Sequence, residues 1–162
     1  MSVPGAVEAI CIAPEKHGSQ QSVKSAELVA GSGIVGDRYF GRNPGQNLTL
    51  VEAEEIERFN REQGGRAPLE GTRRNVVTRG IRLVPLIGAE FSIGGVRLRG
   101  VEQCEPCSDL GGNLATEQLS SAQVVKAFVH RAGIRAEVLS GGTIRIGDPI
   151  ATRATTPSPP SP

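Results

Sequence analysis

The chain has 162 residues, 38% of them hydrophobic and 22% charged, which is enough to bury one core but too few for two full-sized domains. Its net charge of +1, without a sustained Lys/Arg block, argues against a nucleic-acid polymer or an anionic membrane as partner. The N-terminus does not resemble a secretory leader, no apolar run is long enough to span a membrane, and three cysteines do not fit a secreted disulfide framework, so we expect a cytoplasmic protein.

The first predicted element is a strand over residues 7–12. Apolar residues occupy both of its faces, with Val7, Ala9 and Cys11 on one of them, as expected for a strand buried on both sides. Twenty-one glycines and a single tyrosine indicate short strands joined by tight turns around an aliphatic core.

A glycine-rich loop follows at residues 31–41 and surrounds Asp37 and Arg38. Such a backbone can wrap closely around a small group, with a guanidinium projecting into it. The run lacks the Gly-Lys-Ser/Thr ending of a P-loop and the spacing of a dinucleotide-binding loop. The alternative is that Asp37 and Arg38 only pair with each other across a glycine turn.

The next segment, residues 51–61, has helical periodicity, with Ile56 and Phe59 on one face. Thr49 and Glu52 have the spacing of a capping box, which would start this helix.

Two adjacent arginines, Arg73 and Arg74, precede Asn75 at the mouth of an apolar strand. Arginine suits planar, bidentate recognition of phosphate, so an anion site is one interpretation. The other is a solvated pair of charges at a strand end.

Alternating residues flank Gly94-Gly95 and Gly141-Gly142, which predicts hairpins over residues 91–99 and 139–146. Two glycine hairpins favour a mainly β, barrel-like fold with two or three short helices.

Cys104 and Cys107 form a Cys-x-x-Cys motif after the first predicted hairpin. A zinc site would need a second pair of ligands at suitable spacing, and a thioredoxin-like dithiol would open a helix in a βαβ unit. Both interpretations fit poorly. One remaining interpretation is a single reactive thiolate, Cys107, with Cys104 as neighbour or resolving thiol. The other is two half-buried cysteines that act as small hydrophobes.

A further helix is predicted from Ser120, which has capping-box spacing to Gln123. Its apolar stripe comprises Val125, Phe128, Val129 and Ala132. The two histidines are His17, in a predicted loop, and His130, in the last turn of this helix, so we expect no histidine acid–base chemistry. One domain over residues 1–154 and a disordered Pro/Ser/Thr tail over residues 155–162 complete the chain.

Taken in order, these loops resemble the MOSC domain, the module named after the C-terminal part of molybdenum cofactor sulfurase, as a small stand-alone bacterial-type member. The matching runs are Gly33-Ile-Val-Gly-Asp-Arg38, Asn47-Leu-Thr-Leu-Val-Glu52, Arg73-Arg-Asn-Val-Val-Thr78, Cys104-Glu-Pro-Cys-Ser-Asp-Leu110 and Gly141-Gly-Thr-Ile-Arg-Ile-Gly-Asp148.

The resemblance implies a β-barrel-like fold and a molybdenum cofactor (molybdopterin). It assigns molybdenum ligation to Cys107. Cys104 departs from the family pattern, since many relatives lack a thiol there, and we expect it to act with Cys107 as a second catalytic thiol. The resemblance also assigns cofactor binding to a polar set. That set is Arg38, Thr49, Arg73, Arg74 and Asn75.

Two functions follow from the resemblance. The first is an oxidoreductase that acts on N-hydroxylated small molecules through cysteine-ligated molybdenum, with electrons from a separate partner. The alternative is a non-enzymatic carrier that delivers persulfide sulfur or the cofactor itself to an acceptor protein.

Overall fold

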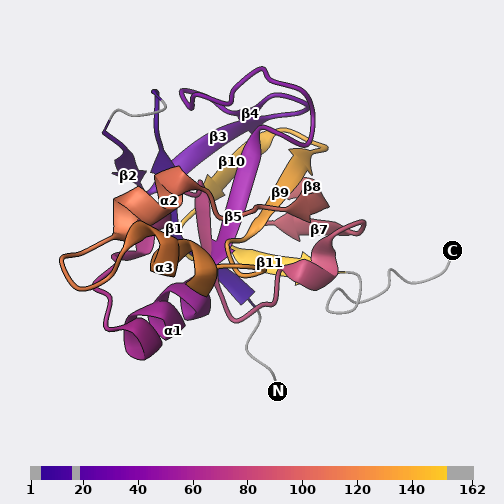
Figure 1. The fold of residues 1–162 in the computed structure, drawn as a ribbon. Coiled ribbons are helices and arrows are strands. Elements are labelled where there is room, and N and C mark those ends of the chain that lie inside the picture. Colours follow the sequence, from indigo (N-terminus) through magenta and orange to yellow (C-terminus); the bar gives the residue numbers. More distant parts are fainter. Residues whose placement is uncertain (1–4, 16–18, 153–162) are drawn as a thin grey trace, which may run out of the picture.

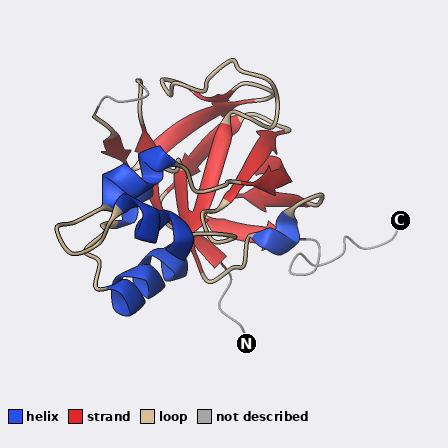
Figure 2. Ribbon diagram, in the orientation of Figure 1, coloured by secondary structure: helices blue, strands red, loops and turns tan. Residues whose placement is uncertain are grey.

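The computed structural model describes residues 5–15 and 19–152, which form mostly β-structure with three short α-helices (Figures 1 and 2). The strands are β1 (Gly5–Ile12), β2 (Gln21–Val23), β3 (Ser25–Val29), β4 (Gly33–Ile34), β5 (Leu48–Glu52), β6 (Val76–Arg79), β7 (Glu90–Ile93), β8 (Val96–Gln103), β9 (Ile134–Val138), β10 (Gly142–Arg145) and β11 (Pro149–Thr152). The helices are α1 (Ala53–Gln63), α2 (Ser108–Leu114) and α3 (Ser121–Ala127), with 3₁₀ turns η1 (Leu69–Thr72) and η2 (Val84–Leu86). The predicted fold class is confirmed, whereas the predicted tail at 155–162 lies outside the described residues.

Seven strands close into a barrel in the order β11-β7-β8-β9-β5-β6-β1, because β1 pairs with β11 as well as with β6. β5 and β6 run parallel, with Leu50 opposite Val76, whereas the other barrel pairings are antiparallel. The parallel pair therefore begins at one end of the barrel and finishes at the other. A second sheet, β10-β3-β4, lies beside the barrel.

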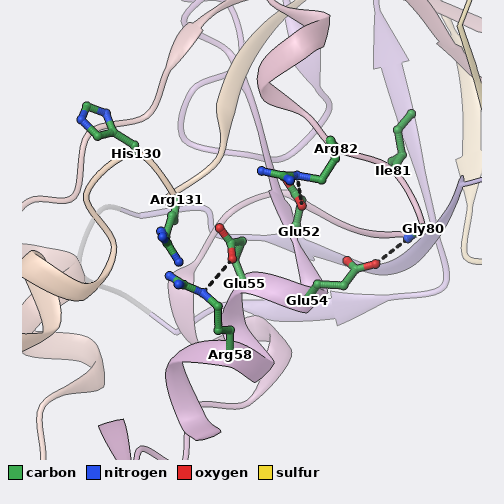
Figure 3. A pocket seen from close by; sticks show the side chains of 9 residues that line it. All are labelled: Glu52, Glu54, Glu55, Arg58, Gly80, Ile81, Arg82, His130 and Arg131. Carbon is green, nitrogen blue, oxygen red and sulfur yellow. Dashed lines mark hydrogen bonds and ion pairs between the residues drawn. The ribbon is translucent and has the colours of Figure 1, made fainter. Parts of the chain in front are cut away.

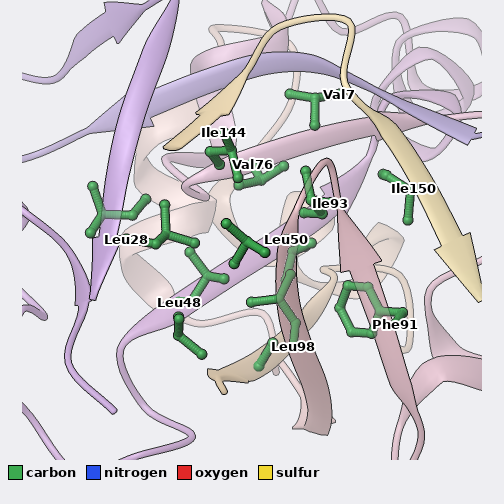
Figure 4. Packing of buried hydrophobic residues seen from close by; sticks show 14 of the residues in the cluster. Val7, Leu28, Leu48, Leu50, Val76, Phe91, Ile93, Leu98, Ile144 and Ile150 are labelled. Carbon is green, nitrogen blue, oxygen red and sulfur yellow. The ribbon is translucent and has the colours of Figure 1, made fainter. Parts of the chain in front are cut away.

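The main core fills the barrel with aliphatic side chains and one phenylalanine, Phe91 (Figure 4). Leu50 and Leu98 come from barrel strands, and Ile144 from β10 reaches the same cluster, so the second sheet closes over the barrel interior. Burial of such side chains stabilises the fold by about 1.5–3 kcal/mol for each fully buried residue.

The three α-helices gather on one side of the barrel (Figures 1 and 2). A second apolar cluster joins them, and in it the rings of Phe59 and Phe128 lie 5.0 Å apart between centroids. Cys104 belongs to this cluster and not to the barrel core.

Strict alternation along the first strand was a wrong prediction. A bulge at Glu8 shifts the register between Val7 and Ala9, so these two residues face different apolar clusters. One extra residue in a strand reverses the side to which every later side chain points.

The hairpin at residues 91–99 is confirmed, with Ile93 opposite Val96. The hairpin at 139–146 is wrong, because β9 pairs with β8 and β5 while β10 pairs with β3. The Gly141-Gly142 turn takes the chain from the barrel to the second sheet.

α1 begins two residues later than predicted, because Val51 and Glu52 still belong to β5. Glu52 occupies the N-cap position without a side-chain cap bond, so the Thr49–Glu52 capping box is wrong. Ile56 and Phe59 are buried on one face, as predicted.

The capping box of Ser120 and Gln123 at α3 is confirmed. α3 ends at Ala127, so Val129 lies beyond it with 42% of its surface exposed, and His130 occupies a turn with φ 63°. Within the described ranges, no helix is both long and apolar enough to cross a membrane.

Candidate functional site

The glycine-rich loop is built around the Asp37 carboxylate, whose side chain is fully buried. Its Oδ1 accepts a hydrogen bond from the Ala13 backbone N–H at 3.0 Å, and its Oδ2 accepts one from Tyr39 at 3.2 Å. All four surrounding glycines have positive φ, so the loop can turn tightly around Asp37 and place its two carboxylate oxygens against the Ala13 and Tyr39 N–H groups. Asp37 therefore anchors the loop to the end of β1.

Arg38 is held beside this carboxylate. Its Nη2 donates to the Tyr39 hydroxyl at 3.2 Å, and its Cζ lies 4.3 Å from the centre of the Tyr39 ring. Nη1 is 3.9 Å from Asp37 Oδ1, a loose ion pair. Nε and Nη1 are buried and have no hydrogen-bond partner among the described residues. Pairing with Asp37 thus leaves guanidinium donors unused.

The two adjacent arginines diverge. Arg73 has left-handed backbone geometry, φ 60°, and its Nη2 donates to the Glu15 carbonyl at 3.0 Å. Arg74 Nε donates to the Ala132 carbonyl at 2.9 Å, while its Nη2 is buried without a hydrogen-bond partner in the described part of the chain. Since Ala13 binds Arg38 through backbone and Glu15 binds Arg73, the segment after β1 brings these two arginines to the same region.

Asn75 and Thr49 form a closed network. Asn75 Oδ1 accepts from the Thr49 backbone N–H at 3.0 Å and from its hydroxyl at 3.2 Å, and Asn75 Nδ2 donates to the Cys11 carbonyl at 3.2 Å. The Thr49 hydroxyl in turn accepts from the Asn75 backbone N–H at 2.9 Å. These bonds tie β1, β5 and β6 together where the parallel pair begins. We call this end of the pair, with Thr49, Arg73, Arg74 and Asn75, the arginine end.

The three cysteines are free and differ in environment. Cys104 is buried in the helical cluster, and burial raises the pKa of its thiol against the opposing effect of the nearby Arg74 guanidinium. Cys11 is also buried, and desolvation raises its pKa to about 11. Cys107 is exposed at the N-cap position of α2. Of the three, Cys107 alone is open to a ligand or partner.

Cys107 precedes α2, and the far end of this helix, at Leu114, contacts η1. The helix packs on η1, the turn that leads into Arg73, so closely that a Cβ on Gly71 would lie 2.8 Å from Leu114 Cδ2. No hydrogen bond or ion pair joins the Cys107 side chain to Arg38, Arg73 or Asn75 within the described ranges. The structure thus packs α2 on η1 without joining the Cys107 side chain to these residues in the described part of the chain.

A charged groove at the opposite end of the parallel pair was not predicted from the sequence (Figure 3). Its cavity of about 620 Å³ is lined by Glu52, Glu54, Glu55, Arg58, Gly80, Ile81, Arg82, His130 and Arg131. We call it the glutamate end. The only sequence signal was a run of Glu and Arg at the start of a helix, which usually marks a solvated face.

The described residues include no group of three or more His, Cys, Asp or Glu side chains that could hold a metal ion.

The comparisons with known proteins agree with the fold. The family model described as "MOSC domain" matches residues 36–151. No curated protein matches the sequence.

Similar solved structures include three proteins with names. The YuaD protein from Bacillus subtilis superposes with a TM-score of 0.80 at 22% identity, covering 91% of this chain and 94% of that one. YiiM from Geobacillus stearothermophilus has a TM-score of 0.72 at 16% identity, covering 92% and 75%. YiiM from Escherichia coli has a TM-score of 0.61 at 17% identity, covering 94% and 69%. At these identities the likeness concerns the fold.

Proposed function

The chain belongs to the MOSC domain family, and on that premise we propose that it binds a molybdenum-pterin cofactor and reduces N-hydroxylated small molecules. The observation that carries the proposal is the exposure of Cys107 alone among three free cysteines, on a helix packed against the turn that leads into Arg73.

The donor chemistry of the site suits such a cofactor. A thiolate is a soft ligand that molybdenum accepts, and Cys107 is accessible to provide it. The buried guanidinium atoms of Arg38 and Arg74 that lack hydrogen-bond partners among the described residues match an anionic phosphate, which offers several acceptors. When bound, the cofactor would supply two-electron chemistry at the metal.

In this proposal the residues of the chain bind the cofactor and position its ligands. Cys107 would hold the metal, and Arg38, Arg73 and Arg74 would bind the anionic part of the pterin. Asn75 and Thr49 keep the strands in register and so position the two adjacent arginines, because their hydrogen bonds are made within the protein. Cys104 is a buried neighbour whose raised pKa disfavours a thiolate.

The net reaction breaks the N–O bond of the substrate, returns a hydrogen to nitrogen and releases the oxygen as water. Two electrons come from a separate donor protein and two protons from solvent. The cytoplasmic location predicted from the sequence is part of this proposal, and the three free thiols support it.

The test uses full-length protein purified from a host that makes the cofactor. Elemental analysis for molybdenum and fluorescence of the oxidised pterin are measured for the wild type, Cys107→Ala and Cys11→Ala. We expect both signals in the wild type and in Cys11→Ala, which makes the same chemical change at a buried cysteine. Loss of both signals in Cys107→Ala supports the proposal, and wild-type protein without molybdenum and pterin overturns it.

A carrier role is the second candidate, and the exposure of Cys107 favours it because an acceptor protein can reach that thiol. Intact-mass spectrometry of wild type and Cys107→Ala distinguishes the two functions. A mass increase of one sulfur atom on Cys107, in protein that has no reductase activity, supports the carrier.

A further inference from the structure

Phe40, in the glycine-rich loop, is the one phenylalanine of four that lies outside the apolar clusters. Phe59, Phe91 and Phe128 are at most 4% exposed, whereas 41% of the Phe40 surface is exposed. Val35 of the same loop is 45% exposed. Exposed apolar side chains that share one segment mark a candidate interaction surface.

Hydrogen bonds within the loop fix the backbone around Phe40. The Phe40 N–H donates to the Asp37 carbonyl at 3.0 Å, and the Gly41 N–H donates to the Ser32 carbonyl at 2.9 Å. The buried Asp37 carboxylate ties the same turn to the end of β1. Because an ordered loop loses little conformational entropy when a partner binds, these bonds favour docking.

Two arginines beside Phe40 give this surface a positive charge. The guanidinium carbons of Arg38 and Arg42 lie 4.3 and 5.3 Å from the centre of the Tyr39 ring. Arg42 is exposed, and within the described ranges its side chain makes no hydrogen bond or ion pair. The loop's own carboxylate, Asp37, is buried and accepts from two backbone N–H groups. Interfaces are enriched in aromatic residues and arginine, and the positive charge selects an acidic partner.

The position of the loop connects this surface to the proposed cofactor site. In Figure 1 the connection from β4 to β5, which carries Phe40 and Arg42, projects beyond the strands and away from α1. Arg38, two residues before Phe40, is one of the residues that would bind the anionic part of the cofactor. Glu27 and Arg145, exposed on the adjacent strands β3 and β10, offset each other in charge. A protein bound to the exposed side of the loop would therefore lie close to the cofactor.

We propose that Val35, Phe40 and Arg42 dock an acidic one-electron carrier protein that supplies the reducing equivalents. This inference rests on the reductase function proposed above. Two reduced carriers each give up one electron and are oxidised. These two electrons and two protons from solvent convert the N–O bond of the substrate to N–H and release water.

The test measures reduction of benzamidoxime by cofactor-loaded, full-length protein with two electron sources. The protein donor is a plant-type two-iron ferredoxin, an acidic carrier kept reduced by NADPH and its reductase. Dithionite is the small reductant, which needs no docking surface. Calorimetric titration with ferredoxin measures binding in the absence of turnover.

Two variants change the surface. Phe40→Ala should raise both the half-saturating ferredoxin concentration and the Kd about tenfold, because an exposed aromatic anchor is lost. Arg42→Gln should raise them about threefold at low salt and leave them unchanged at about 0.5 M salt, where surface charge is screened. Both variants should keep the wild-type melting temperature and the wild-type rate with dithionite, since neither side chain is buried.

Matched controls are Val129→Ala and Arg66→Gln, which make similar changes at exposed residues beyond α3 and α1. Both should behave like the wild type with either electron source. Wild-type protein that fails with dithionite overturns the reductase function, and this inference with it. Wild-type protein that works with dithionite but not with ferredoxin, or an equal response of the surface and control variants, overturns the docking surface alone.

Discussion

The two ends of the parallel β5–β6 pair both carry buried polar side chains, yet they use them differently. At the arginine end, Asn75 and Thr49 direct their hydrogen bonds to each other and to Cys11, so the polar atoms hold three strands together. At the glutamate end, Glu54 leaves its buried Oε1 without a partner among the described residues, in a groove that Arg131 also lines. Buried polarity alone therefore does not mark a ligand site: Asn75 and Thr49 are matched within the protein, whereas buried atoms of Arg74 and Glu54 have no partner among the described residues.

One turn connects the two ends. The Ala132 carbonyl accepts from Arg74, and the Gly133 carbonyl accepts from the Cys104 backbone N–H at 2.8 Å, while His130 and Arg131 line the groove. Gly133 has φ 99°, and a Cβ there would overlap the Leu50 carbonyl. Glycine at this position lets the turn lie against β5.

The largest expected effect comes from a substitution that breaks the hydrogen-bond network at the arginine end. Asn75→Ala removes three side-chain hydrogen bonds and leaves the Thr49 N–H and the Cys11 carbonyl buried without them. We expect the free energy of unfolding to fall by about 3 kcal/mol, measured by urea denaturation. Gln118→Ala, an exposed change, should alter it by less than about 0.5 kcal/mol. A loss below about 1 kcal/mol for Asn75→Ala would mean that the network is not structural.

The cysteines offer a second test of the arginine end. In native protein, iodoacetamide should modify Cys107 first, because that thiol is exposed. The pKa of Cys11 rises from 9.0 to about 11, which lowers its thiolate fraction about a hundredfold at neutral pH even before burial hinders access. Peptide mass spectrometry over a time course measures the rates. Modification of Cys11 or Cys104 at the rate of Cys107 would contradict the burial of those two thiols.

The smallest expected effect is the change in folding stability with pH that two carboxylates, Glu52 and Glu57, cause. Burial raises the pKa of Glu52 above its ordinary 4.5, so its ionisation disfavours the folded state, and this cost is absent below pH 4.5 and complete above the raised value. The hydrogen bond from Arg79 lowers the pKa of Glu57, so the stability it adds is present above pH 4.5 and is lost as pH falls through the lowered value.

Urea denaturation across this range should therefore show opposite trends. Relative to wild type, Glu52→Gln should gain stability as pH rises above 4.5, whereas Glu57→Gln should lose its disadvantage as pH falls below 4.5. Parallel trends in the two variants would contradict the opposite pKa shifts of these two carboxylates, one buried and one paired with Arg79.

Local chemistry allowed part of the fold to be predicted from sequence. The Gly94-Gly95 hairpin and the Ser120 capping box depend on neighbouring residues, and both were predicted correctly. The bulge at Glu8 and the partner of β10 depend on strands distant in sequence, and both were missed. For the site, the loops that carry Arg38, Arg73 and Cys107 were identified from their residue types.

The sequence by itself determined a mainly β protein of the MOSC family, because glycine spacing and the ordered motifs are local properties of the chain. Only the tertiary structure decided how each polar group is used. It buried Cys104 and exposed Cys107, engaged Asn75 with Thr49, and left Arg131 facing a groove. Burial and hydrogen-bond partnering depend on which distant segments pack together, so residue types alone do not specify them.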